Sequence, residues 1–346
     1  MLGLDLAERG LLPDTVVRAG IRAILRERLR EIDAADCERE RERHQAFLDE
    51  ARQAPIALET DAANQQHYEV PAELFELVLG PHLKYSCAHF GPTTRDLGEA
   101  EARMLALVGE RVALADGQRV LDLGCGWGSF SLWAAKRHPK SRFVAVSNSK
   151  SQAEFIRRRA DRGGLSNLSV ETADINVFEP EGAFDRIVSV EMFEHVRNHG
   201  ALLGRIARWL APTGLLFVHH FAHRSAAYPY ATDGEDDWMG RYFFTGGMMP
   251  SDDWLLAFQD DLAVRRRWCV SGVHYQKTSD AWLANLDRRR REALPILRAT
   301  YGAGQEELWL QRWRIFFLAC SELFGYRSGQ EWWVTHSVLG HRELAR

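Results

Sequence analysis

The pattern of hydrophobic and polar positions predicts a helical segment at the start of the chain. In "TVVRAGIRAILRERLREI" (15–32) apolar residues recur at helical spacing, with arginines on the other face. This amphipathic helix either docks on the protein core or lies on an anionic membrane, so peripheral membrane contact stays open. Residues 33–55 are dense in charge and predict another helix or an irregular segment.

From about residue 105 short apolar segments alternate with helical ones. The segments "QRVLDLGC", "SRFVAVSNS", "LSVETAD", "FDRIVSVEM" and "GLLFVHHF" predict five strands. Strands that alternate with helices predict an α/β fold, with a parallel sheet covered on both faces. Residues 226–290 break this rhythm and predict a lid insertion, before a final helix and strand. We therefore expect an N-terminal helical segment (1–100) and a core domain (101–346).

Composition narrows the class of protein. The chain has 346 residues, 46% of them hydrophobic and 27% charged, which is ordinary for a soluble globular protein. The net charge of −4 and the lack of a basic stripe argue against nucleic acid as a partner. We expect no transmembrane segment, because no apolar run approaches ~18 residues. The scattered five cysteines and the lack of a signal peptide predict a cytoplasmic protein with free thiols and no metal site.

A glycine-rich loop follows the first predicted strand of the core. "VLDLGCGWGS" (120–129) runs from a strand through three alternating glycines into a helix. Open α/β sheets bind nucleotides at this place. The spacing G-x-G-x-G lacks the third glycine of the dinucleotide fingerprint, which disfavours a nicotinamide oxidoreductase. Asp122, just before the loop, is suited to holding a cationic amine.

This loop resembles motif I of class I S-adenosylmethionine (SAM) methyltransferases. The resemblance implies a Rossmann-like core with a mostly parallel seven-stranded sheet, SAM as cofactor and S-adenosylhomocysteine as product. Most members place an acid after the second strand to bind ribose, whereas polar side chains stand there in this chain and can hydrogen-bond ribose instead. The implied cofactor-binding residues of these segments are Asp122, Gly124, Cys125, Gly126, Asn148, Gln152, Asp174 and Ile175.

Further segments narrow the resemblance. Four segments resemble sequences of the cyclopropane fatty acid synthase superfamily. They are the polar end of the second strand, "HYEVPAELFELVLG" (67–80), "LKYSCAHF" (83–90) and "MFEHV" (192–196). Within this superfamily, "RYFFTGGMMPS" (241–251) and later segments resemble coclaurine N-methyltransferase-like proteins. The resemblance implies that Tyr85 and Ser86 reach the SAM carboxylate. It also implies that a helix with His67 and Tyr68 closes over the cofactor as a lid.

Two acids and an imidazole follow the fourth strand in "RIVSVEMFEHVRN" (186–198). If the acceptor is an aliphatic amine, it is mostly protonated at pH 7, with a pKa near ~10, and attacks only as the free base. A carboxylate or imidazole at the methyl end of the cleft would take this proton. The resemblance to N-methyltransferases assigns the role to Glu194 and His195. Glu191 is either a helix-cap or supporting group, or touches the ligand itself.

An alkene acceptor is the alternative. Cyclopropane synthases are thought to use a bound bicarbonate as base, held by a Cys, a Glu, a His and a Tyr. The matching candidates here are Cys87, Glu194, His219 and Tyr275. The long resemblance favours a small or medium amine with an aromatic or apolar body over the acyl chain of an unsaturated phospholipid. A SAM-binding protein without catalysis is a third hypothesis, which the intact Glu194–His195 pair disfavours. The sequence predicts no oligomeric state.

Overall fold

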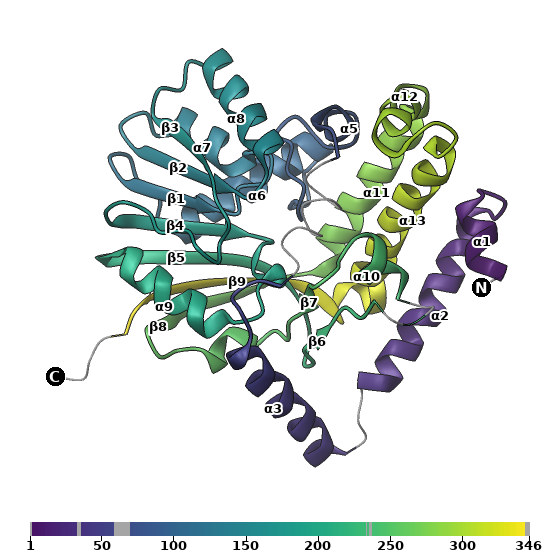
Figure 1. Ribbon diagram of the computed structural model, residues 1–346, viewed down its shortest axis with the longest axis horizontal. Coiled ribbons are helices and arrows are strands. Elements are labelled where there is room, and N and C mark those ends of the chain that lie inside the picture. Colours follow the sequence, from purple (N-terminus) through teal and green to yellow (C-terminus); the bar gives the residue numbers. More distant parts are fainter. Residues whose placement is uncertain (1, 33–35, 59–69, 233, 235–236, 343–346) are drawn as a thin grey trace.

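The protein is built on a seven-stranded sheet in the order β3-β2-β1-β4-β5-β9-β8, as expected for the methyltransferase fold. The computed structural model describes residues 2–32, 36–58, 70–232, 234 and 237–342. The neighbours from β3 to β5 are parallel, whereas β9 is antiparallel to both β5 and β8 (Figure 1). The strands are β1 (Arg119–Leu123), β2 (Arg142–Ser147), β3 (Leu168–Thr172), β4 (Phe184–Val190), β5 (Leu210–His223), β8 (Leu262–Val270) and β9 (Trp332–His341).

Helices cover both faces of the sheet because its central strands are apolar on both sides. Along β1, Val120 packs with α6 (Leu97–Arg111) and α7 (Ser129–Arg137). The next residue, Leu121, packs with α3 (Cys37–Gln53) and α9 (His199–Trp209). Successive side chains of a strand point to opposite faces, so continuous apolar runs form a sheet buried on both. Helix α8 (Lys150–Arg162) packs beside α7.

A separate group of helices lies beyond the carboxyl ends of the parallel strands. It comprises α1 (Leu2–Glu8), α2 (Asp14–Ile32), α5 (Ala72–Val78), α11 (Gly272–Arg288), α12 (Arg290–Tyr301) and α13 (Glu306–Gly325). The purple α2 runs beside this group and contacts α13 (Figure 1). Arg18 of α2 donates to Ser321 Oγ (2.9 Å) and to Glu322 Oε1 (2.8 Å) on α13. The predicted amphipathic helix therefore docks on the protein itself.

The region predicted as an insertion includes parts of the core. Residues 226–290 contain β8, which forms the edge of the sheet, and α11. Because β8 is half-exposed along much of its length and carries three consecutive arginines, its apolar pattern was too weak to predict a strand. Outside the sheet lie β6 (Tyr228–Pro229), α10 (Trp238–Tyr242), β7 (Met248–Met249) and the short helix Trp254–Ala257. The predicted lid residues His67 and Tyr68 lie outside the described residues.

Within the described ranges, no helix has the length and apolar character needed to cross a membrane.

A buried carboxylate fixes the segment that enters the site. Glu101 of α6 is completely buried and accepts from the backbone N–H groups of Gly80 (2.9 Å), His82 (2.9 Å) and Lys84 (3.4 Å). Burial raises the pKa of Glu101 to about 7. The three bonds position the chain immediately before Tyr85, Ser86 and Cys87, because an unsatisfied buried N–H is costly.

We expect Glu101→Ala to lower the free energy of unfolding by about 2–4 kcal/mol, because one buried and two partly buried N–H groups lose their acceptor. Urea unfolding monitored by circular dichroism measures this change. The matched control is Glu110→Ala on the exposed face of the same helix, which should stay within about 0.5 kcal/mol of the parent. Equal effects of the two substitutions would contradict a structural role for Glu101.

Candidate active site

The site begins at a strained turn after β4. Strand β4 ends at Val190, and Glu191 has a φ of +49°, which is uncommon for a residue with a side chain. Its N–H donates to the carbonyl of His219 on β5 at 2.7 Å. A short 3₁₀ helix, Phe193–His195, follows. Strain of this kind persists where the surroundings fix the backbone, and it is frequent at functional sites.

The turn brings Glu191 to the centre of a group of donors. Its Oε1 accepts from the N–H of Cys87 (2.9 Å) and from Nε2 of His219 (3.1 Å). Its Oε2 accepts from the Tyr275 hydroxyl (2.6 Å). Burial raises the pKa of Glu191, and the nearby positive charge of Lys84 and the Tyr275 bond oppose this rise. Cys87, His219 and Tyr275 were predicted to act together, and the structure gathers them around Glu191.

Glu194 lies elsewhere. It is completely buried, and its Oε1 accepts from the N–H of Phe221 on β5 at 2.7 Å. Its Oε2 has no hydrogen-bond partner among the described residues. Burial and the neighbouring Glu191 raise the pKa of Glu194 well above its ordinary value, which favours its protonated form. The expectation that Glu194 opens into the cleft is wrong, because its carboxyl group is completely buried against the backbone of β5. A catalytic role for it stays a prediction.

Two cavities meet at Glu191 and His195, which line both of them. The smaller lies over the carboxyl ends of β1 and β2 and is reached by several predicted cofactor residues. The larger, of about 650 Å³, lies between the sheet and the helices α1, α2 and α13. A group transferred from a ligand in one cavity to a ligand in the other would pass beside these two side chains.

The smaller cavity has the lining expected for a nucleoside. Its walls include the predicted residues Gly124, Gly126, Asn148, Gln152, Asp174 and Ile175, together with Ser147. Gly126 has a φ of +52°, and a Cβ atom there would meet nothing within 4 Å. The backbone thus approaches the cavity with no side chain between them, which only glycine allows without strain. These residues fit the SAM site that the sequence predicts.

Four predicted cofactor residues do not line this cavity. Asp122 is buried and accepts from the Ser131 hydroxyl, and burial raises its pKa to about 6. It therefore anchors the glycine loop to α7, where an ion pair with a ligand amine was expected. The Cys125 side chain packs against β2 and α8. Ser86 accepts from the buried Lys84 ammonium, and Tyr85 lines the larger cavity. Contacts of Tyr85 and Ser86 with a SAM carboxylate remain predictions.

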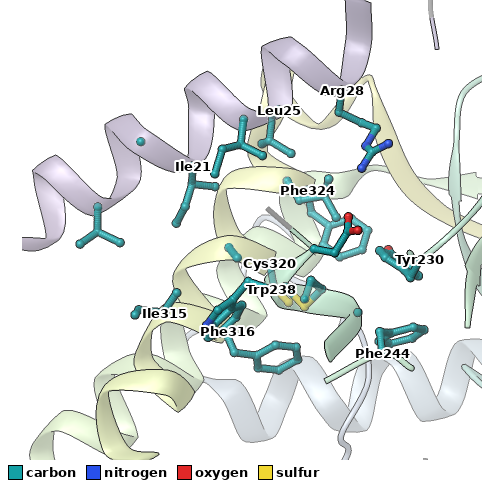
Figure 2. Close-up of a pocket in the computed structure, with 18 of the residues that line it drawn as sticks. Ile21, Leu25, Arg28, Tyr230, Trp238, Phe244, Ile315, Phe316, Cys320 and Phe324 are labelled. Atoms are coloured by element: carbon teal, nitrogen blue, oxygen red, sulfur yellow. The ribbon is translucent and has the colours of Figure 1, made fainter. Parts of the chain in front are cut away.

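The larger cavity is mainly aromatic and aliphatic. Figure 2 shows Ile21 and Leu25 of α2 facing Phe316 and Phe324 of α13 across it. The His195 ring stacks on Phe244, with ring centroids 4.7 Å apart and planes at 22°. The apolar lining of the larger cavity suits the aromatic or aliphatic body of a ligand. The indole N–H groups of Trp332 and Trp333 donate to the hydroxyl of Tyr228 and to the carboxylate of Asp252.

Neither the central position of Glu191 nor the burial of Lys84 is predicted from the sequence. Lys84 is 2% exposed and, among the described residues, has no carboxylate within ion-pair distance. A lysine directly before "YSC" was the available signal, since lysine is rarely buried without a purpose. For Glu191 the available signal was its place directly after a buried strand. Its bonds to Cys87, His219 and Tyr275 depend on contacts that are distant in the chain.

We expect Gly126→Val to weaken S-adenosylhomocysteine binding at least tenfold, because the new side chain enters the smaller cavity. Isothermal titration calorimetry measures the dissociation constant. Gly164→Val is the matched control: this glycine has a φ of +64°, equally open surroundings and a place in the turn after α8. The same loss of affinity in both variants would show that backbone strain, and not the cavity, is responsible.

Comparison with known proteins places the chain among methyl-transferring enzymes. The family model described as mycolic acid cyclopropane synthetase matches residues 57–332. (S)-coclaurine N-methyltransferase of Thalictrum flavum subsp. glaucum is 39% identical over 336 residues, covering 96% of this chain and 93% of that protein. Cyclopropane-fatty-acyl-phospholipid synthase of Escherichia coli (strain K12) is 30% identical over 276 residues, covering 79% and 67%.

A solved structure agrees over almost the whole chain. The crystal structure of coclaurine N-methyltransferase bound to N-methylheliamine and S-adenosylhomocysteine superimposes with a TM-score of 0.93. The two sequences are 37% identical, and the match covers 97% of this chain and 98% of the other. The similarity thus includes the N-terminal helices as well as the sheet.

Proposed function

The chain belongs to the mycolic acid cyclopropane synthetase family, and we propose that it transfers the methyl group of SAM to the nitrogen of an amine. It is a SAM-dependent methyltransferase. The acceptor we propose is a small or medium amine with an aromatic or apolar body, which suits the lining of the larger cavity.

One observation carries the choice of an amine over an alkene. In the alkene reaction a bound bicarbonate would need the groups of Cys87, His219 and Tyr275. Here the carboxylate of Glu191 already accepts from the Cys87 N–H, from His219 and from the Tyr275 hydroxyl. A fixed carboxylate beside the larger cavity attracts an ammonium by charge. This supports amine methylation and leaves little room for a separate anion.

The residues of the chain would act by binding and by proton transfer. When bound, SAM supplies a methyl group that its sulfonium makes electrophilic. The larger cavity would hold the apolar body of the acceptor, and positioning of this kind contributes several kcal/mol to the rate. The ionised Glu191 would bind the ammonium and accept its proton, so that the nitrogen lone pair can attack. His195, which lines both cavities, would pack beside the reacting atoms.

Incubation with methyl-labelled SAM tests the acceptor class. One pool contains secondary and primary arylalkyl amines, the other vesicles of unsaturated phospholipid. We expect label in N-methylated amines and none in the lipid pool, as read by mass spectrometry. A labelled cyclopropane product confined to the lipid pool would refute the proposal.

A pair of matched substitutions separates the two acids. We expect Glu191→Gln to lower kcat at least 100-fold at pH 7.5, because the amide cannot take a proton. Glu194→Gln should keep kcat within about fivefold, because the raised pKa of Glu194 favours its neutral form and the amide oxygen of the glutamine can still accept from Phe221. Steady-state kinetics measures kcat, and binding of S-adenosylhomocysteine should change little in either variant. The reverse order of effects would assign the proton transfer to Glu194.

A further inference from the structure

A chain of hydrogen bonds leads from Glu191 through the sheet to α6. His219 of β5 contacts Glu191 Oε1 through Nε2 at 3.1 Å, and its Nδ1 lies 2.9 Å from Nε2 of His336. His336 lies directly opposite His219 in the antiparallel ladder of β5 and β9. Its Nδ1 pairs with the Nη1 atom of Arg111, the last residue of α6. Neither imidazole has exposed surface.

Chemistry fixes the direction of this chain. A guanidinium only donates hydrogen bonds, and an ionised carboxylate only accepts them. With Arg111 donating to Nδ1 of His336, that imidazole carries its proton on Nε2 and donates to Nδ1 of His219. His219 then also carries its proton on Nε2 and donates to Glu191. Both rings are neutral and hold the same tautomer.

Burial keeps the two rings neutral. It lowers the pKa of His219 and of His336 well below the ordinary value of 6.5, and the positive charges of Arg111 and Lys84 act in the same direction. Arg111 is half-buried, with its guanidinium 4.7 Å from the ring centroid of Trp268. The fixed positive charge at this end of the chain is therefore the guanidinium.

We propose that Arg111 is a positioning residue for methyl transfer, which acts through His336 and His219 to orient Glu191 and to favour its ionised form. The proposal rests on the proposed function, because it assigns to Glu191 the proton of the acceptor. The other titratable or charged groups around Glu191 include Lys84, Cys87, Glu194, His195, Tyr275 and Cys320. His220 is a further titratable group near the two imidazoles.

Removing the guanidinium should change the pH dependence of the reaction. In Arg111→Gln the positive charge is lost, so the ionised form of Glu191 is less favoured and its pKa rises. The acidic limb of the kcat profile should therefore move to higher pH, and kcat at pH 7 should fall at least tenfold. Arg111→Lys should recover part of this loss, since an ammonium keeps the charge and one donor.

Two controls separate this effect from others. Arg186→Gln removes another half-buried arginine, on β4, whose guanidinium donates to the carbonyls of Ala113 and Asp185 and not to the histidines. Its kcat profile should match the parent. The second control compares two acceptor amines of different pKa. If the acidic limb of the kcat profile shifts with the pKa of the amine, it reports ionisation of the substrate. If it shifts only when Arg111 is replaced, it reports ionisation of the enzyme.

Nitrogen-15 chemical shifts of the imidazoles test the chain independently of activity. In the parent protein both His219 and His336 should appear as the neutral Nε2–H tautomer from pH 6 to 8, and Arg111→Gln should disturb both. A protonated or Nδ1–H form of either ring in the parent protein would overturn the proposal, even if the variant fails to fold. So would an Arg111→Gln variant with lower stability but an unchanged pH profile. Labelled lipid as the product of the parent enzyme would refute amine methylation and leave the tautomer result interpretable.

Discussion

The buried carboxylate of Glu191 is the constraint on which the site depends. An acid with about 10% of its side chain exposed needs several donors to remain ionised, and it finds them on three separate elements. The N–H of Cys87 comes from the loop after α5, the imidazole of His219 from β5 and the hydroxyl of Tyr275 from α11. These bonds hold the helical group against the carboxyl edge of the sheet. The same contacts that lower the cost of the charge therefore define where the two cavities meet.

The antiparallel end of the sheet contributes to this site as well as to the core. Because β9 runs against β5, His336 lies opposite His219, and the end of α6 brings Arg111 within reach of it. On the other side, Glu101 of α6 fixes the backbone that leads to Cys87. One helix therefore supports the carboxylate from two directions, although none of its residues lines either cavity.

The sequence predicted the features that depend on local pattern. Apolar strands, the glycine loop and the polar strand ends at Asn148, Gln152 and Asp174 follow from short stretches, and the structure places these residues in one cavity. The missed features depend on contacts distant in the chain. Glu191 and Glu194 are three residues apart and chemically equal, but they have different partners. The turn with the positive φ places Glu191 among Cys87, His219 and Tyr275, whereas Glu194 accepts from the N–H of Phe221. Strand β8 was missed because an edge position tolerates its arginines.

Amine and alkene methylation would differ in which base lies among the donors from Cys87, His219 and Tyr275. It is either a carboxylate of the chain or a bound anion such as bicarbonate. The donors from Cys87, His219 and Tyr275 converge on the carboxyl group of Glu191, where the two cavities meet. A chain without a side chain at position 191 would leave these donors free to hold a small diffusible anion. In this chain a carboxyl group is covalently attached at this place and is held by its three partners before the acceptor arrives. A tethered carboxylate suits a cationic acceptor that must be attracted and deprotonated, whereas an uncharged alkene gains nothing from it until a carbocation has formed.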